Sequence, residues 1–220
     1  MLHFRDGLNV MCRRHTRDWD VVHELLFAKS YQRALYYLRD QPGHPIVLDL
    51  GGNIGLFSLL ASAANRHANV VAFEPGPPNY ALFEINRLAN PTLSDRIELR
   101  KKAVGGTARS TEWFFDETNP GGSGLFSAGG KSYPVDIIPF AEAIAEAAGN
   151  IALVKIDIEG AEYEILNHTG SETWERVQAI SLELHDDPGR QGSQDDFLAR
   201  LQSYGFRLET ESVCSYFLSR

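Results

Sequence analysis

Hydrophobic positions along the chain fall into short runs that alternate with segments of helical spacing. Apolar runs typical of buried strands include Ile46–Leu50 and Ile151–Ile156. The other strands that we expect are 8–12, 70–73, 97–99, 111–115, 135–138, 179–184, 206–210 and 216–218, and the expected helices are 21–38 with a break near Ser30, 56–64, 79–89, 140–148, 161–166 and 195–204. This alternation predicts an α/β fold with a mostly parallel, doubly wound sheet.

The pattern also indicates one continuous domain. The 220 residues contain no internal repeat, and a chain of this length buries a substantial core without metal or disulfide staples. We interpret residues 1–44 as an N-terminal helical lead-in, whose first helix begins behind a cap at Asp18 or Asp20, and residues 45–220 as a Rossmann-like core.

The charge balance argues against polyanionic partners. The chain has 21 Lys and Arg residues against 29 Asp and Glu, a formal net charge of −8. Phosphate backbones and anionic membranes are usually met by clustered Lys and Arg. The run Arg13-Arg14-His15 with Arg17 is interrupted by acidic residues, so we expect it to be solvated surface. Nucleic acid is therefore not an expected partner.

Further composition features bear on location. No apolar stretch approaches the ~18–20 residues of a spanning helix, and the first residues lack an apolar signal core. We therefore expect no membrane association and a cytoplasmic protein. Cys12 and Cys214 have no metal-ligand spacing and are expected to be reduced thiols.

The first candidate chemistry follows the strand 46–50, in the pattern Asp49, Gly51, Asn53 and Gly55. Glycines at such a turn let the backbone approach a nucleotide-type ligand. The dinucleotide fingerprint needs glycine at the first, third and sixth positions, but counting from Gly51 the latter two are Asn53 and Leu56, which disfavours NAD. A carboxylate at the strand end suits the sulfonium and ammonium of S-adenosylmethionine (SAM).

Glu74 ends the next strand, where an acid accepts both hydroxyls of a ribose in nucleotide-binding units. Glu74 by itself does not separate SAM from NAD. Each acid also has an alternative interpretation, with Asp49 as a helix cap and Glu74 as a solvated strand end.

These motifs resemble the FkbM-type SAM-dependent methyltransferases. The resemblance rests on Val-Leu-Asp-Leu-Gly-Gly-Asn-Ile-Gly at 47–55, Val-Ala-Phe-Glu-Pro at 71–75, Lys-Ala-Val-Gly at 102–105 and Lys-Ile-Asp-Ile-Glu-Gly-Ala-Glu at 155–162, and it extends to 20–31. The resemblance implies a Rossmann-like class I methyltransferase fold with an antiparallel last strand. It also implies methyl transfer, commonly to oxygen.

Position in such a fold assigns roles to the cofactor residues. We expect Asp49, Gly51, Asn53 and Gly55 to contact the methionine portion of SAM, Glu74 the ribose, and the Ala103 backbone the adenine rim.

Candidate catalytic residues follow the strands 151–156 and 179–184. Asp157 and Glu159 are two residues apart, on one side if the strand continues, and Glu183 and His185 repeat the arrangement. We expect these four residues to face the substrate cleft, with Asp157 and His185 ranked first as a base. An ordinary His pKa near ~6.5 suits proton removal.

Structural roles stay open for the same residues. Asp157 is alternatively a contact for the cofactor amino group, Glu159 a helix cap and His185 a polar strand end. The four side chains also have the chemistry of divalent metal ligands, but spacing gives no distances, so the expected metal is none.

Two further features bear on the acceptor. The Gly-rich segment 119–131 is long enough to be a lid or a disordered connection. Trp19, Tyr31, Trp113 and Phe126 are expected either in an acceptor pocket or in the core.

The sequence thus predicts an O-methyltransferase acting on a hydroxyl of a small metabolite such as a sugar or polyketide. The alternatives are a carboxyl or nitrogen acceptor, an NAD-dependent oxidoreductase and a non-catalytic cofactor-binding protein. The partner is a small-molecule acceptor, and the oligomeric state stays open.

Overall fold

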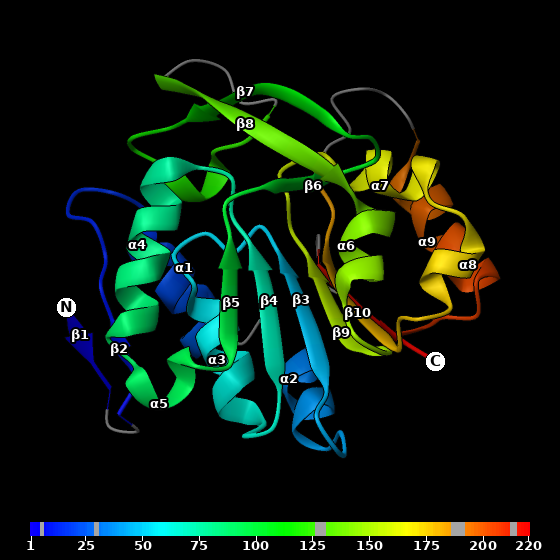
Figure 1. Ribbon diagram of the computed structural model, residues 1–220, viewed down its shortest axis with the longest axis horizontal. Helices are drawn as coiled ribbons and strands as arrows, with labels where there is room; N and C mark the ends of the chain where they lie inside the picture. Colours follow the sequence, from blue (N-terminus) through cyan, green and yellow to red (C-terminus); the bar gives the residue numbers. More distant parts are fainter. Residues whose placement is uncertain (5–6, 29–30, 126–130, 186–191, 212–214) are drawn as a thin grey trace.

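The computed structural model of the protein describes residues 1–4, 7–28, 31–125, 131–185, 192–211 and 215–220. Seven strands within these residues form a central sheet (Figure 1). In spatial order they are β11 (Arg207–Glu211), β12 (Ser215–Ser219), β10 (Ala179–Glu183), β9 (Ile151–Ile156), β3 (Ile46–Leu50), β4 (Asn69–Phe73) and β5 (Ile97–Arg100). The predicted α/β architecture is confirmed.

Strand directions also follow the prediction. The adjacent strands from β10 through β9, β3 and β4 to β5 are parallel. Strand β12 runs antiparallel to both of its neighbours, β10 and β11. The last strand in the chain is thus antiparallel, and it lies second from the edge of the sheet.

Helices cover both faces of the sheet because its strands are apolar on both sides. The described helices are α1 (Asp18–His23), α2 (Gln32–Arg39), α3 (Leu56–Ala64), α4 (Pro77–Leu88), α5 (Pro91–Ser94), α6 (Phe140–Glu146), α7 (Glu162–His168), α8 (Ser171–Trp174) and α9 (Gln194–Ser203). Val47 packs in a buried cluster with residues of α2, α3 and α4. Its neighbour Leu48 packs in another, with residues of α6, α7 and α9. This alternation along one strand separates the two layers of the core.

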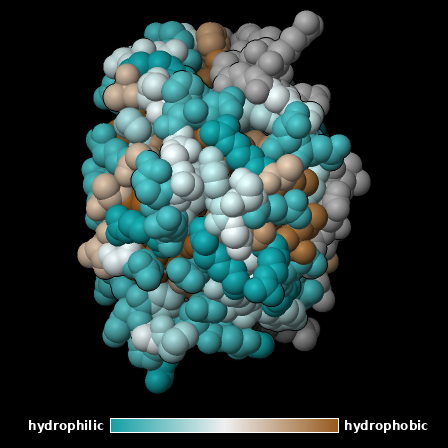
Figure 2. Space-filling model, turned by 90° about the vertical axis from the view of Figure 1, so that its right-hand side faces the viewer, coloured by the Kyte–Doolittle hydropathy of each residue, from teal (hydrophilic) through white to brown (hydrophobic). Residues whose placement is uncertain are grey.

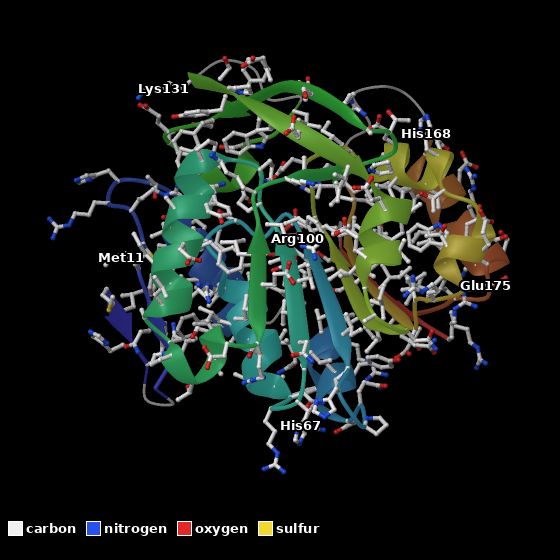
Figure 3. All side chains as sticks on the ribbon, viewed as in Figure 1. Met11, His67, Arg100, Lys131, His168 and Glu175 are labelled. Atoms are coloured by element: carbon white, nitrogen blue, oxygen red, sulfur yellow. The ribbon has the colours of Figure 1, made fainter. Side chains whose placement is uncertain are left out.

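A smaller sheet lies across the carboxyl ends of the parallel strands (Figure 1). It has the order β6 (Ala103–Gly105), β8 (Lys131–Pro139) and β7 (Arg109–Phe115). Figure 3 labels Lys131 at this upper end and His67 at the opposite end of the central sheet. Strand β8 is longer than the 135–138 expected from the sequence, because its first residues pair with β7.

The lead-in is not only helical. It contains the paired strands β1 (Leu2–His3) and β2 (Asn9–Val10), then α1 and a π-helix over Glu24–Ala28. The predicted acidic cap of α1 is wrong: the N-cap is Arg17, without a side-chain hydrogen bond, and Asp18 is buried.

Asp18 is instead the partner of Arg13. The Asp18 carboxylate accepts from the Arg13 backbone N–H at 2.8 Å and from its guanidinium at 2.9 and 2.8 Å. The same guanidinium donates to Asn79 on α4 at 2.8 Å. The basic run is therefore solvated at Arg14 and His15, as expected, but not at Arg13.

The described part of the Gly-rich segment is bonded to the smaller sheet. Phe114 and Gly124 exchange two backbone hydrogen bonds, at 3.0 and 3.1 Å. Cys12 is a free thiol. Expectations about Ser30, Phe126, Gly129-Gly130 and Cys214 fall outside the described residues.

None of the helices in the described ranges has the length and apolarity needed to cross a membrane. Figure 2 shows the side carrying α8 and α9, where hydrophilic residues dominate and apolar ones form small spots.

Candidate active site

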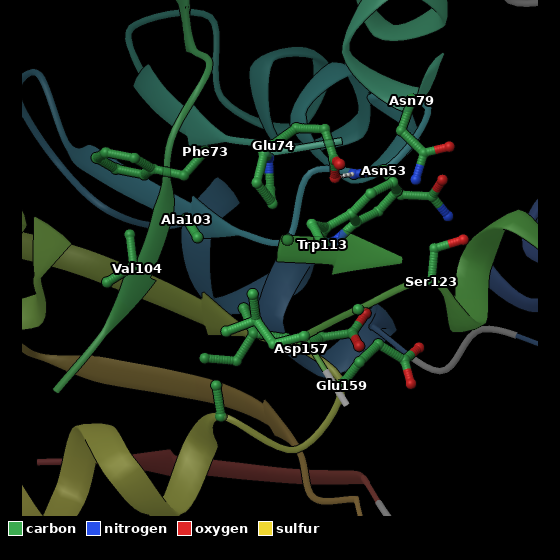
Figure 4. A pocket seen from close by; sticks show the side chains of 16 residues that line it. Asn53, Phe73, Glu74, Asn79, Ala103, Val104, Trp113, Ser123, Asp157 and Glu159 are labelled. Atoms are coloured by element: carbon green, nitrogen blue, oxygen red, sulfur yellow. Dashed lines mark hydrogen bonds between the residues drawn. The ribbon is translucent and has the colours of Figure 1, made fainter. Parts of the chain in front are cut away.

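A cavity opens at the carboxyl ends of the central strands, beneath the smaller sheet (Figure 4). Its walls combine the loops after β3, β4 and β9 with β6, β7 and the segment after Pro120. The lining residues are Gly51, Asn53, Phe73, Glu74, Pro75, Asn79, Ala103, Val104, Trp113, Ser123, Gly124, Leu125, Asp157, Ile158, Glu159 and Ala161. This first cavity contains most of the predicted cofactor residues.

The glycine loop after β3 passes close to the loop after β9. Gly51 has φ +79°, and a Cβ there would lie 1.9 Å from the Asp157 carbonyl oxygen. Asn53 also adopts a left-handed backbone, with φ +46°, although it is not glycine. Its buried Oδ1 has no hydrogen-bond partner among the described residues, and Asn53 lines the first cavity. Only glycine fits at position 51, because both the backbone angle and the contact exclude a side chain.

Glu74 is 3% exposed and lies against the backbone of two loops. Its Oε2 accepts from the Asn53 N–H and its Oε1 from the Gly76 N–H, each at 2.8 Å. Burial raises the pKa of Glu74 to about 7, although these hydrogen bonds oppose the shift. The interpretation of Glu74 as a solvated strand end is therefore wrong.

Asp49 does not line the cavity. Its side chain is fully buried, accepts from the Ser58 hydroxyl of α3 at 2.6 Å, and has its Oδ1 3.6 Å from the Lys155 ammonium. Burial raises the pKa of Asp49, against the charge of Lys155 and the Ser58 hydrogen bond. The alternative of a cap is also wrong, because α3 begins after Gly55 without a side-chain cap.

Lys155 lies between Asp49, beneath the glycine loop, and Asp157, which lines the cavity. It lies opposite Asp49 in the β3–β9 register and is 3.0 Å from Asp157 Oδ2. Its ammonium also donates to the Gly51 carbonyl at 2.7 Å. Burial alone would lower the pKa of Lys155, but the charges of Asp157 and Asp49 outweigh burial, so the pKa is raised.

Tyr31 brings the lead-in to the strand ends. It is 4% exposed, and its hydroxyl is 3.1 Å from Glu183 Oε2 and 3.3 Å from Asp157 Oδ2. Its ring packs edge-on against Phe57 of α3. Burial, Asp157 and Glu183 raise the pKa of Tyr31 well above its usual value, so the hydroxyl stays a donor.

Four acidic side chains surround His185. Its Nδ1 lies 2.9 Å from Glu162 Oε1, and its Nε2 lies 3.5 Å from Glu159, 3.9 Å from Asp157 and 4.0 Å from Glu183. Burial lowers the pKa of His185, but Glu162, Glu159 and Asp157 outweigh it and raise it to about 10. The premise of an ordinary imidazole pKa is therefore wrong, since the isolated site holds an imidazolium at neutral pH.

The expected common side of Asp157 and Glu159 depended on the strand continuing through them, and it does not continue. β9 ends at Ile156, and Glu159 has φ +55°. Glu162 fixes this turn, because its fully buried carboxylate accepts from the Ile158 and Gly160 N–H groups at 3.0 and 2.9 Å. Glu159 is not the cap of α7 either, which begins after Ala161 without a side-chain cap.

The carboxylates differ in how readily they ionise. Burial opposes ionisation of Asp157, but Lys155 and His185 lower its pKa. Burial raises the pKa of Glu159 to about 7, and burial with the charges of Asp157 and Glu24 raises that of Glu183 to about 7. Asp157, Glu159 and His185 also offer three atoms within 4.8 Å of one another, a spacing that one metal ion bridges.

A second cavity adjoins the first. Asn53, Asp157 and Glu159 line both, and the lead-in supplies much of the remaining wall. The other lining residues are Arg17, Asp20, Val21, Glu24, Leu25, Tyr31, Asn119, Gly122 and Glu183.

The structure thus sorts the predicted residues into three groups. Gly51, Asn53, Glu74, Ala103 and Asp157 line the first cavity, whereas Asp49 and Gly55 lie behind it. Asp157, Glu159, Glu183 and His185 gather in one cluster. Among the aromatics, Trp113 is buried and lines the first cavity and Tyr31 lines the second, whereas Trp19 is 49% exposed and lines neither of these two cavities.

Sequence reasoning missed Lys155, Glu162 and Asn79. Lys155 carried a usable signal, as a lone cation inside an otherwise apolar strand. Glu162 stood in the motif at 155–162 without a role. Nothing in the sequence marked Asn79, which lines the first cavity and donates to the Pro120 carbonyl at 3.2 Å.

Comparison with known proteins identifies the family. The family model described as "Methyltransferase FkbM domain" matches residues 49–208. The chain belongs to the FkbM methyltransferase family. It is 26% identical over 217 residues to 31-O-demethyl-FK506 methyltransferase FkbM of Streptomyces tacrolimicus, covering 86% of this chain and 81% of the relative. It is 24% identical over 198 residues to methyltransferase sdnD of Sordaria araneosa, covering 76% of each.

Solved structures agree on the fold. An FkbM methyltransferase of Methylobacillus flagellatus KT has a TM-score of 0.58 at 11% identity, covering 96% of this chain. This chain spans only 56% of that larger FkbM protein. Magnesium protoporphyrin IX methyltransferase of Synechocystis PCC 6803, solved with SAM, has a TM-score of 0.53 at 13% identity, covering 96% of this chain and 84% of the other. The predicted class I methyltransferase fold is confirmed, and the FkbM family makes this chain a methyltransferase enzyme.

Proposed function

We propose that the chain transfers a methyl group from SAM to a hydroxyl of a small metabolite. The supporting observation is that two cavities meet at Asn53, Asp157 and Glu159. A cofactor in one and an acceptor in the other would meet at these side chains. The name of the Streptomyces relative, a 31-O-demethyl-FK506 methyltransferase, supports oxygen as the acceptor atom and natural-product metabolism as the setting.

The first cavity fits the chemistry of SAM. Glu74 is a buried carboxylate on its wall, suited to paired ribose hydroxyls. Phe73, Val104 and Trp113 supply apolar wall for an adenine ring, near the Ala103 backbone. The Asn53 Oδ1, to which no residue in the described part of the chain donates, is an acceptor that a ligand donor group would satisfy.

The residues behind the cavity would position those that line it. Lys155 holds the glycine loop from below through the Gly51 carbonyl, and Asp49 holds the helix that follows the loop, α3, through the Ser58 hydroxyl. We therefore assign Asp49 a positioning role. Gly51 and Asn53, which line the cavity, are the loop residues assigned to the methionine portion, and Gly55 shapes the turn.

A bound SAM would supply an activated methyl group, whose carbon would bond to the acceptor oxygen while the carbon–sulfur bond broke and left its electron pair on sulfur. The hydroxyl proton must pass to a base. Asp157, Glu159, Glu183 and His185 form our candidate catalytic set, and Glu159 borders both cavities. Asp157 borders both cavities too, but its pKa is lowered by Lys155 and His185 whereas burial raises that of Glu159 to about 7, so we place Glu159 as the base nearest the reacting atoms.

The lead-in would recognise the acceptor. Val21, Leu25 and Tyr31 contribute apolar surface to the second cavity, and Glu24 contributes charge at the start of the π-helix. π-Helical turns frequently occur at functional sites.

Two measurements test this function. Isothermal titration of the purified chain with S-adenosylhomocysteine and with NADH should show binding of the former alone. Incubation with methyl-labelled SAM and a panel of sugars, macrolides and their carboxylated and aminated counterparts should then label a hydroxyl. Tight binding of NADH alone would point to an oxidoreductase.

Other outcomes select the remaining alternatives. Label on a carboxylate or amine would change the acceptor class. Cofactor binding without any methylated product across the panel would indicate a non-catalytic binding protein. A carboxylate acceptor needs no base, so an unchanged rate both in Glu159→Gln and in the double variant Asp157→Asn, His185→Asn would count against base catalysis.

A further inference from the structure

Nε2 of His185 faces three carboxylate oxygens without touching any of them. The separations are 3.5 Å to Glu159 Oε2, 3.9 Å to Asp157 Oδ1 and 4.0 Å to Glu183 Oε1. A charge-assisted hydrogen bond would bring nitrogen and oxygen to about 2.7–2.9 Å. Two ligands that each lie about 2.1 Å from one ion are separated by roughly 3–4 Å. The spacing is that of shared coordination.

In His185, Asp157 and Glu183, the nitrogen or oxygen that faces away from the cluster is bound by a residue outside it. His185 directs Nδ1 at Glu162, a fully buried carboxylate at 2.9 Å. Carboxylate partners of this kind orient metal-binding histidines by accepting the proton of the nitrogen that does not bind metal. The ring is thereby set with Nε2 toward the three oxygens.

The carboxylates repeat this division. Asp157 uses Oδ2 for Lys155 and Tyr31, at 3.0 and 3.3 Å, and turns Oδ1 toward His185. Glu183 uses Oε2 for Tyr31 at 3.1 Å and turns Oε1 toward His185. These outer contacts come from β9 and the lead-in, and they leave the inward-facing atoms to converge.

We propose that Asp157, Glu159 and His185, joined by Glu183, bind one divalent cation. Carboxylate oxygens with a single imidazole nitrogen suit hard to borderline ions such as Mn²⁺ and Mg²⁺. Asp157, Glu159 and Glu183 also line the second cavity, so the remaining coordination positions would face an acceptor. This site differs from the metal-free site expected from the sequence, where spacing gave no distances.

The chemical role of the ion rests on the proposed function. An acceptor hydroxyl on a divalent cation loses its proton more readily and is held in one orientation, as in-line transfer requires. Cation binding itself depends on neither SAM nor the acceptor, and it is tested without them.

The experiment is a titration of the chelator-treated chain with MnCl₂, followed by the electron paramagnetic resonance signal of free Mn²⁺. We expect one bound Mn²⁺ per chain, displaced by excess Mg²⁺. Glu159→Gln and His185→Ala should each weaken binding at least tenfold, and Glu183→Gln should weaken it less. His67→Ala, at the other end of the sheet (Figure 3), is the matched control and should bind like the parent chain.

Circular dichroism of each variant checks that the fold is kept, and Glu159 is only half-buried, so Glu159→Gln should fold. Absence of binding at millimolar Mn²⁺, or binding unchanged in both Glu159→Gln and His185→Ala, would overturn the proposal. One Mn²⁺ per chain that both variants weaken would support it even if no methyl acceptor were found. Conversely, methyl transfer by a chain that binds no Mn²⁺ would support the proposed function and contradict the cation site.

Discussion

The ammonium of Lys155 lies 2.7 Å from the carbonyl oxygen of Gly51, and this contact ties the interior of the sheet to the glycine loop. Lys155 also compensates Asp49, which is fully buried on the neighbouring strand. One buried cation thus sets both the charge balance beneath the loop and the position of the loop itself.

Replacing Lys155 by Met should destabilise the protein strongly. Removing one member of a buried ion pair typically costs about 3–5 kcal/mol, because the other charge stays buried without compensation. Urea unfolding measures this loss. Lys131→Met, which breaks the exposed pair with Glu117, is the control and should leave stability almost unchanged, because solvent screens that pair. If Lys155→Met were as stable as this control, the buried pair would have no structural importance.

The double variant Lys155→Met, Asp49→Asn should be more stable than Lys155→Met alone, because the unpaired carboxylate is gone. Additive losses in the double variant would contradict direct coupling of the two residues.

Gly51→Ala should prevent stable folding, whereas Gly43→Ala should be tolerated. Both glycines have a left-handed backbone, with φ +79° and +72°. A Cβ at Gly51 would lie 1.9 Å from the Asp157 carbonyl oxygen, but a Cβ at Gly43 meets nothing within 4 Å. The control should therefore lose only the ~1–2 kcal/mol of backbone strain. Thermal melts followed by circular dichroism compare the two, and equal losses would argue against the loop contact.

Cofactor affinity should depend on pH through Glu74. The raised pKa of about 7 means that Glu74 is largely protonated at about pH 6, whereas accepting two ribose hydroxyls requires the carboxylate. Binding must then release a proton, so affinity for S-adenosylhomocysteine should rise about tenfold from pH 6 to pH 8.

Titration calorimetry at several pH values tests this dependence, and Glu74→Gln is the control that should flatten it. The nearby charges, Lys155 and Asp49, are unchanged in that variant. A pH dependence that persists in Glu74→Gln would assign the proton to another group.

Arg13→Ala should destabilise the lead-in far more than Arg14→Ala. Arg13 pairs with Asp18, which is 1% exposed, whereas Arg14 faces solvent. Leaving a buried carboxylate unpaired costs about 3 kcal/mol or more, and an exposed substitution stays within about 0.5 kcal/mol. Limited proteolysis and urea unfolding report the difference, and equal stability of the two variants would remove Arg13 from the structure of the lead-in.

Strand positions could be predicted because buried parallel strands are apolar on both faces. The runs at Ile46–Leu50 and Ile151–Ile156 match the observed strands for this reason. Strand β8 was harder, because Lys131–Pro139 has one exposed side and its length depends on pairing with β7. The residue pattern of Lys131–Pro139 alone does not indicate that it pairs with β7.

The site was predictable as a set of strand ends but not as a set of contacts. The sequence placed Asp49 at a ligand, and the structure places it against Ser58 and Lys155, because its side chain points into the layer containing α3. It gave His185 an ordinary imidazole, whereas carboxylates that converge from separate segments raise its pKa to about 10. Charges that are remote in the chain determine both results.

The lead-in lies outside the region that the family model matches, which begins at residue 49. Yet Asp20, Glu24, Leu25 and Tyr31 form a wall of the second cavity, while the first cavity, where we propose that SAM binds, is lined by residues within the matched region. Substitutions in the lead-in could therefore change the acceptor without altering the residues that line the first cavity. If the lead-in recognises the acceptor as we propose, a chimera carrying another member's lead-in should inherit that member's acceptor.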